Sequence, residues 1–216
     1  MIDLKRCRLY GILDLGYVEW EDADHVAGAM ISGGVDILQL RAKKLDVATI
    51  TEVAAKLHRL TSAAGVPLII NDYPEIARAI GAEGVHVGQD DLSIARVREM
   101  MGSDCVVGRS THSLTQARQA AAGGADYIGF GPLFATPTKP DYLPIGLEEI
   151  AAVHAQVPLP IFCIGGIKLE NLPTVLAAGA RRVVIVSGLL HAPDIAKYAR
   201  AAKALLHPQS EISNQK

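Results

Sequence analysis

The stretch GVHVGQDD, residues 84–91, decides the fold class of this 216-residue chain. Its first half is an apolar strand, and its second half is a polar loop with two adjacent carboxylates, Asp90 and Asp91. The same order of apolar strand, polar loop and alanine-rich helical segment recurs along the chain. We predict strands at residues 9–13, 36–40, 67–70, 84–87, 105–108, 127–130, 160–164 and 182–186. Eight such βα units with strands buried on both faces predict an α/β fold, a closed (β/α)8 TIM barrel.

The length of the chain fits a single barrel domain over residues 1–207, with a polar C-terminal tail, 208–216, that we expect to fray. Half of the residues are hydrophobic, but they fall in short runs, far below the roughly 20 residues that span a bilayer. The N-terminus lacks the pattern of a secretory signal, and the three cysteines are widely separated. We therefore expect a cytoplasmic protein without a disulfide framework.

The formal charge of −2 and the few aromatic residues predict neither nucleic-acid binding nor attraction to anionic membranes. Small molecules are the expected partners. Barrels with exposed alanine-rich helices often associate, so a homo-oligomer is compatible with the sequence.

Basic residues follow the second predicted strand. Gln39, Arg41 and Lys43 are spaced by two, so in an extended segment they project to the same side and could converge on one anion. Taken alone, such a pair of cations is more often a solvated edge.

Carboxylates follow the third and fourth predicted strands. Asn71 can donate to a phosphate oxygen, and Asp72 offers an oxygen ligand to Mg²⁺, although an Asn-Asp turn before the helix at Pro74 would explain both. Of Asp90 and Asp91, we expect one to cap the next helix and the other to bind. Carboxylates from two neighbouring strands suit Mg²⁺, which takes its other ligands from water and phosphates.

Further polar residues lie in or after the fourth, fifth and sixth strands. His86 lies within its strand, where a histidine is more often a hydrogen-bonded core residue than a ligand. Ser110 follows the fifth strand most closely and could touch substrate or cap a helix. The long loop 131–140 is typical of a lid or of a proline-stiffened surface loop, and in it Thr136 and Thr138 have phosphate-binding chemistry and Lys139 could neutralise a leaving group.

Glycines follow the last two strands, in Ile164-Gly165-Gly166-Ile167 and Val186-Ser187-Gly188-Leu189. They let backbone N–H groups approach a phosphate at the recurrent phosphate site of this fold. The sequence thus predicts two separate anion sites, one with a metal and one without, as an enzyme that joins two phosphorylated substrates would need.

Five motifs, in this order, resemble the thiamine-phosphate synthase family: QLRAK at 39–43, ND at 71–72, GVHVGQDD at 84–91, TPTK at 136–139 and IGGI at 164–167. The resemblance implies a Mg²⁺-dependent transferase. It would condense 4-amino-2-methyl-5-hydroxymethylpyrimidine diphosphate with a thiazole phosphate, giving thiamine phosphate and pyrophosphate. In this family the pyrophosphate is thought to leave before the thiazole nitrogen attacks, so no covalent nucleophile is needed.

The resemblance also implies roles for individual residues. Those that would hold the pyrimidine diphosphate are Gln39, Arg41, Lys43, Asn71, Ser110 and Lys139. Among these, the catalytic residues would be Ser110, Lys139, Arg41 and Lys43. Those that would bind the thiazole phosphate are Thr136, Pro137, Thr138, Gly166, Val186 and Ser187. Asp72 and Asp91 would ligate Mg²⁺.

Two segments, GRSTHS at 108–113 and VSGL at 186–189, instead resemble the related thiazole tautomerases, in which a histidine at the position of His112 would shuttle a proton. A tautomerase has no need of a diphosphate cradle, so the synthase is the first reading and the tautomerase the alternative. A third reading is a barrel that binds thiamine intermediates without turnover, against which Asp72 and Asp91 argue.

Overall fold

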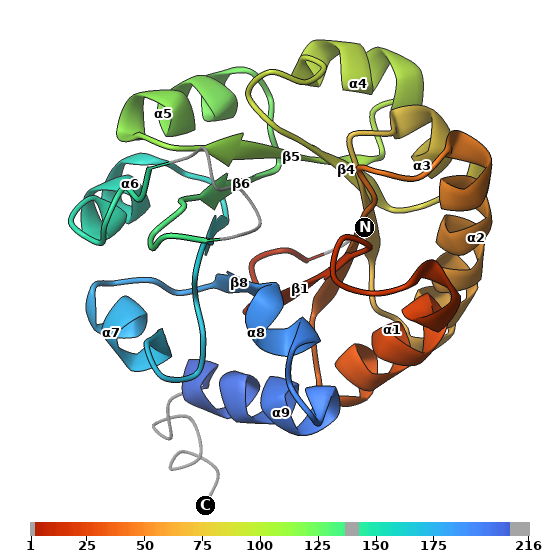
Figure 1. Cartoon of the computed structure of the whole chain (residues 1–216). Coiled ribbons are helices and arrows are strands. Elements are labelled where there is room, and N and C mark those ends of the chain that lie inside the picture. The colour runs from red at the N-terminus through yellow and green to blue at the C-terminus, as the bar shows by residue number, and fades with distance from the viewer. Residues whose placement is uncertain (1–2, 137–142, 208–216) are drawn as a thin grey trace, which may run out of the picture.

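Eight parallel strands close into a barrel in chain order, with β8 paired to β1 (Figure 1). The structure is a computed structural model and describes residues 3–136 and 143–207. The strands are β1 (Leu9–Asp14), β2 (Ile37–Arg41), β3 (Leu68–Asn71), β4 (Gly84–Val87), β5 (Val106–Thr111), β6 (Tyr127–Phe130), β7 (Ile161–Cys163) and β8 (Val183–Ile185). The predicted TIM barrel is confirmed.

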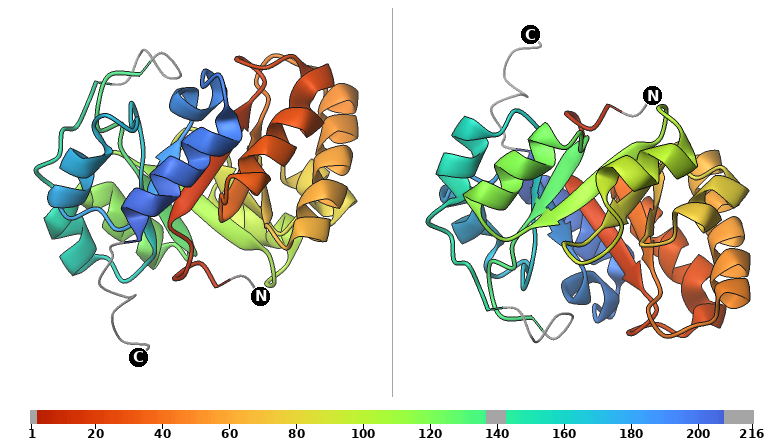
Figure 2. Two further views of the ribbon diagram at one scale, coloured as in Figure 1. Left: turned by 90° about the horizontal axis from the view of Figure 1, so that it is seen from below. Right: turned by 90° about the horizontal axis from the view of Figure 1, so that it is seen from above.

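Helices surround the barrel and cover the outer faces of the strands (Figure 2). They are α1 (Ala23–Ser32), α2 (Val47–Ala64), α3 (Pro74–Ile80), α4 (Ile94–Met101), α5 (Leu114–Ala122), α6 (Ile150–Gln156), α7 (Leu172–Ala177) and α9 (Ile195–Leu206). Two short helices, η1 (Trp20–Asp22) and α8 (Ser187–Leu190), precede α1 and α9. Nowhere in the described part of the chain is a helix both long and apolar enough to cross a membrane.

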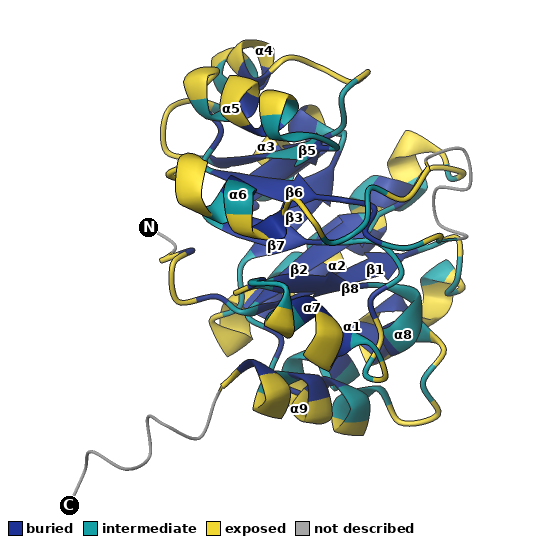
Figure 3. Cartoon of the chain, turned by 90° about the vertical axis from the view of Figure 1, so that its left-hand side faces the viewer, coloured by how far each residue is buried: buried dark blue, intermediate teal, exposed yellow. Residues whose placement is uncertain are grey.

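The strands are buried on both faces, as continuous apolar runs predict, while the helices expose their outer faces (Figure 3). One core fills the space between strands and helices. A second, smaller core lies inside the barrel and includes Tyr10, Tyr127 and Phe162. The two tyrosines make this inner core partly polar.

Several strand boundaries differ from the prediction in the same direction. The strands that end in Asp14, Arg41 and Asn71 were each predicted to stop one residue earlier, and β5 runs on to Thr111. Ser110 therefore lies within β5 rather than in the loop after it. Polar residues such as Asp14, Arg41 and Ser110 are thus parts of strands. The hydrogen bonds between neighbouring strands keep their backbone extended.

A carboxylate just before each of three strands accepts a backbone N–H from the start of the strand before it. Asp36 accepts from Leu9 N at 2.9 Å, Glu83 from Leu68 N at 2.8 Å, and Asp126 from Val107 N at 2.6 Å. These bonds tie β1 to β2, β3 to β4 and β5 to β6 at the end of the barrel where the strands begin.

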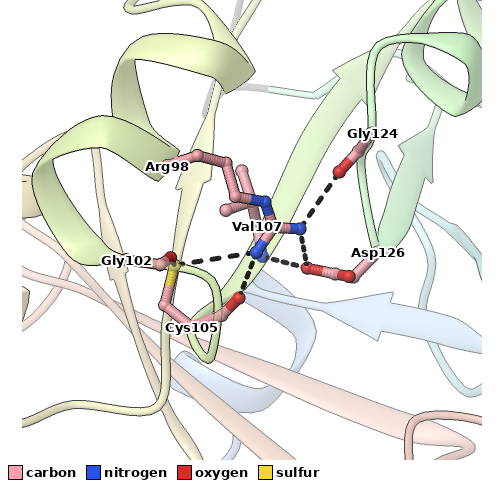
Figure 4. A network of polar contacts seen from close by, with 6 residues as sticks. All are labelled: Arg98, Gly102, Cys105, Val107, Gly124 and Asp126. Carbon is pink, nitrogen blue, oxygen red and sulfur yellow. Dashed lines mark hydrogen bonds and ion pairs between the residues drawn. The ribbon is translucent and has the colours of Figure 1, made fainter.

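Arg98 of α4 reinforces the last of these links (Figure 4). Its guanidinium lies 2.6 Å from the Asp126 carboxylate and donates to the carbonyls of Cys105 and Gly124 at 2.5 and 3.0 Å. A helix, the start of β5 and the approach to β6 are thereby joined by one side chain. This fixes the strand that carries Ser110.

Candidate active site

One cavity opens at the carboxyl ends of the strands, the end of this fold where chemistry gathers. Every strand except β7 contributes a residue to it or to its rim. The residues that line it are Ile12, Gln39, Arg41, Asn71, His86, Ser110, Thr111, His112, Gly129, Gly131, Pro132, Thr136, Ile164, Gly165, Gly166, Ile167, Val184, Val186 and Ser187. Eight residues expected in the site are among them: Gln39, Arg41, Asn71, Ser110, Thr136, Gly166, Val186 and Ser187.

Arg41 is held at the cavity by a carboxylate from the neighbouring strand. Asp14 lies directly opposite Arg41 in the register of β1 and β2, and its carboxylate is 2.5 Å from the guanidinium. Asp14 is only 2 % exposed and also accepts from Gly16 N at 2.9 Å. The pairing offsets the cost of burying both charges and orients Arg41.

Lys43 lies beyond the end of β2, so the alternation that brings Gln39 and Arg41 to the cavity does not extend to it. Lys43 instead forms an ion pair with Asp72. The basic cluster predicted from the sequence is therefore divided between two carboxylates rather than aimed at one point.

Asp91 lies close enough to Asp72 to influence the ionisation of Asp72. Burial raises the pKa of Asp72, Asp91 raises it further, and Lys43 lowers it. Asp72 has a φ of 66°, a left-handed conformation that Asp tolerates better than most residues, and it accepts from Asn71 Nδ2 at 2.7 Å. Two crowded carboxylates, one of them desolvated, form a donor pair that a divalent cation would stabilise.

The loop that carries Asp91 is fastened to β5. Arg109 donates to the carbonyls of Gln89 and Leu92 at 3.0 and 2.9 Å, and Gln89 Nε2 donates to the Ser110 carbonyl at 2.5 Å. The Asp91 carboxylate accepts from Gly88 N at 2.7 Å. These contacts hold Asp91 in place without a role for it as a helix cap.

Neither of the alternative capping roles fits the structure. Ser93 caps α4 by accepting from Arg96 N, so the expectation that Asp90 or Asp91 caps this helix is wrong. Ser93 directly precedes Ile94, the first residue of α4, whereas Asp91 lies two residues further from the helix. Ser113 likewise caps α5, which leaves Ser110 for the cavity.

Glycines shape the opposite wall of the cavity. Gly166 has a φ of 65°, and a Cβ there would lie 2.7 Å from Phe134 Cβ and 2.9 Å from the Ala135 carbonyl oxygen. Asn171 Nδ2 donates to the Gly166 carbonyl at 2.9 Å. Ser187 begins α8 beside this turn. Gly166 is therefore required for packing against residues 134–135, and the approach of its backbone to a phosphate stays a prediction.

Two further hydrogen-bonding residues of the cavity are histidines. His86 bonds through Nε2 to Ser110 Oγ at 2.9 Å and through Nδ1 to the Tyr127 hydroxyl at 3.1 Å, in keeping with the hydrogen-bonded core residue predicted from its position in β4. His112 bonds through Nδ1 to the Gly131 carbonyl.

The remaining expected residues, Pro137, Thr138 and Lys139, lie outside the described residues, as does the predicted tail at 208–216. Four residues that the sequence did not single out are Asp14, Tyr10, Tyr127 and Gln89. Asp14 carries the same signal as Asp72, a carboxylate at a strand end, and could have been found by it. The tyrosines gave no such signal, because they lie inside apolar runs.

The fold and this cavity define the class of the protein. It is a TIM-barrel enzyme with basic side chains, acidic side chains and a glycine turn around one cavity. Residues 9–189 match the family model described as thiamine monophosphate synthase. The chain belongs to that family.

Relatives with this activity in their names are similar in sequence over nearly the whole chain. The thiamine-phosphate synthase of Chloroflexus aurantiacus is 42 % identical over 205 residues, 94 % of each chain. That of Shouchella clausii is 40 % identical over 211 residues, 97 % of this chain and 100 % of the relative. Among solved structures, a thiamine phosphate pyrophosphorylase from Pyrococcus furiosus superposes with a TM-score of 0.85 at 28 % identity, covering 98 % of this chain and 99 % of that one.

Proposed function

We propose that this chain is a transferase that condenses the hydroxymethylpyrimidine diphosphate with a thiazole phosphate to form thiamine phosphate and pyrophosphate. The observation that carries the proposal is the layout of the cavity. Arg41 and Asn71 lie on the side of β2 and β3, with Lys43 and the Asp72 and Asp91 pair close by, and Gly166 and Ser187 lie on the side of β7 and β8. One cavity therefore offers two places for an anion.

The carboxylates of Asp72 and Asp91 fit Mg²⁺, which commonly takes one or two protein carboxylates. Among the residues described, no group of three or more His, Cys, Asp or Glu side chains is placed to hold a metal. Water and the substrate diphosphate would complete the coordination. Once bound, Mg²⁺ would neutralise charge on the diphosphate.

The protein's own residues would stabilise the departing pyrophosphate and position the two rings. Arg41 and Lys43, with Lys139 outside the described residues, supply positive charge where negative charge develops. Ser110 would orient the pyrimidine. A dissociative substitution needs no covalent nucleophile, so the main tasks are to bind both substrates side by side and to exclude water.

His112 is the observation that favours a second candidate, the thiazole tautomerase. It lines the same cavity and is oriented by the Gly131 carbonyl, as a proton shuttle would be. Proton transfer by His112 would not need Mg²⁺ or a diphosphate site. Metal dependence therefore separates the two activities.

We also propose a cytoplasmic location and small phosphorylated molecules as partners. Cys7, Cys105 and Cys163 are free thiols, and burial raises the pKa of Cys7 to about 11 and that of Cys163 to about 12. Unreactive free thiols are typical of a reducing compartment.

The test measures thiamine phosphate formation with and without a chelator, in the wild type and in two matched variants. Asp91→Asn removes a proposed metal ligand, and we expect thiamine phosphate formation to fall by at least about 100-fold, as loss of a charge-stabilising group commonly does. Asp90→Asn, an exposed neighbour, should leave the rate unchanged. Chelator-resistant coupling, or equal rates in the two variants, would contradict the metal site. Isomerisation of the thiazole without coupling would favour the tautomerase.

A further inference from the structure

Three neighbouring strands align a histidine, a glycine and a tyrosine beneath the cavity. In the register of β4, β5 and β6, His86 is opposite Gly108, and Gly108 is opposite Tyr127. A Cβ on Gly108 would lie 2.5 Å from His86 Nδ1 and closer still to the Tyr127 hydroxyl. Because Gly108 has no side chain, the rings from the two outer strands meet across it, with the hydroxyl 3.1 Å from Nδ1.

This contact belongs to a series of hydrogen bonds across the barrel interior. Gln39 Nε2 donates to the Tyr10 hydroxyl at 2.6 Å, and the Tyr10 and Tyr127 hydroxyls are 3.0 Å apart. The series then passes from Tyr127 to His86 Nδ1 and from His86 Nε2 to Ser110 Oγ. It ends at a side chain that lines the cavity.

The first member of the series sets its direction. An amide nitrogen donates and does not accept, so Tyr10 accepts from Gln39 and its own hydrogen goes to the Tyr127 oxygen. Tyr127 then donates to His86 Nδ1. With Nδ1 an acceptor, the imidazole carries its proton on Nε2 and donates to Ser110 Oγ. The hydroxyl hydrogen of Ser110 is left to point away from His86.

Burial keeps these protons in place. Tyr10 and Tyr127 are 1 % and 0 % exposed, and burial raises the pKa of both hydroxyls. Both tyrosines are therefore neutral and can donate at neutral pH. A buried donor without a partner is costly, so a reversed series that left one hydrogen unpaired would be disfavoured.

We propose that Tyr127 and His86 are positioning residues that make Ser110 a hydrogen-bond donor to the substrate. This inference rests on the proposed function, since the acceptor would be an atom of the pyrimidine with a lone pair towards Ser110. Tyr127 sets the tautomer of His86, and the tautomer sets which way the Ser110 hydroxyl points. The site would then favour a ring that presents an acceptor there over one that presents N–H.

The direct test is the tautomer of His86, read from the ring ¹⁵N shifts of histidine-labelled protein and assigned by comparison with His86→Gln. The wild type should show an unprotonated, hydrogen-bonded Nδ1 and a protonated Nε2. In Tyr127→Phe the Nδ1 signal should lose its hydrogen-bonded shift or move towards the protonated form. Phe162→Leu is the matched control, because it changes the packing against Tyr127 in the same inner core without removing a hydrogen bond of the series. A wild type protonated on Nδ1 would overturn the proposal, even if neither variant folds.

Kinetics separate this role from a purely structural one. In Tyr127→Phe the KM for the pyrimidine diphosphate should rise about tenfold, the loss expected for one substrate hydrogen bond, with the KM for the thiazole phosphate unchanged. Phe162→Leu should change both by less than about twofold. Equal effects on both substrates, or on both variants, would contradict the role. A wild type with the expected tautomer but no coupling activity would instead overturn the proposed function.

Discussion

Asp14 shows what the position of a single residue does for the site. Its carboxylate pairs with Arg41 only because the register places the two directly opposite each other on β1 and β2. The sequence predicted Arg41 and showed a carboxylate at the end of the first strand, but register is a property of strand pairing and not of either segment alone. The pair became evident only with the barrel closed.

Replacing Asp14 by Asn should therefore weaken the handling of the pyrimidine diphosphate. The guanidinium of Arg41 would lose its charged partner and part of its orientation, and we expect kcat/KM to fall about tenfold, a typical effect of a displaced charge-stabilising group. Steady-state kinetics of Asp14→Asn beside Asp24→Asn, an exposed acidic residue of α1, measure this. A similar loss in both variants would contradict a specific role for Asp14.

The raised pKa of Asp72 predicts how the stability of the metal-free protein changes with pH. Burial and Asp91 raise its pKa above the ordinary value, so the folded protein binds that proton more tightly than the unfolded chain does. In metal-free protein, ionised Asp72 therefore costs stability at neutral pH, and the cost is relieved as the pH falls through the raised pKa. Asp72→Asn should raise the metal-free Tm at neutral pH by about 2–4 °C, the shift that about 1 kcal/mol produces in a domain of this size.

The comparison is made by thermal unfolding at several pH values in the presence of chelator. The difference in Tm between Asp72→Asn and the wild type should shrink towards acid pH. If Asp72→Asn is less stable than the wild type at neutral pH, the ion pair between Lys43 and Asp72 stabilises the fold more than burial and the nearby Asp91 destabilise it. That result would contradict the prediction. The same variant should lose Mg²⁺-dependent coupling, so gain of stability and loss of activity are expected together.

At the scale of the elements, the strands were predictable, but the hydrogen bonds from carboxylates that tie neighbouring strands together were not. The eight apolar runs predicted all eight strands, with β4 and β6 correct at both ends. Glu83 and Asp126 directly precede predicted strands and could have been found by that position, whereas Asp36 was predicted to lie inside the second strand. Their partners, however, are backbone N–H groups of the strand before, which no side-chain pattern reveals.

The link at Asp126 is the one that stability measurements can isolate. Asp126→Ala would leave the Val107 N–H without its partner and take the carboxylate away from the part-buried Arg98. We expect a loss of about 1–3 kcal/mol in the free energy of unfolding, chiefly the cost of the unpaired N–H. Chemical denaturation measures it. Arg98→Ala should cost less, because Asp126 would keep its bond to Val107 N. The reverse order of the two losses would contradict the view that the backbone bond is the main contribution.

At the scale of the whole molecule, the barrel and the residues on the two sides of its cavity were predictable because both follow from local pattern. Strand ends supplied Arg41, Asn71 and Asp72, and glycines after the last strands supplied Gly166. The polar series from Gln39 to Ser110 was not predictable, since it joins residues from five strands inside the barrel. Closure of the sheet brings these residues together.

The central claim is that this one cavity joins two phosphorylated substrates. The most direct measurement follows thiamine phosphate and pyrophosphate together after purified protein is mixed with the pyrimidine diphosphate, the thiazole phosphate and Mg²⁺. The account predicts that both products form in equal amounts and that neither forms when Mg²⁺ is chelated. Pyrophosphate released without thiamine phosphate, or no coupling under any condition, would contradict it.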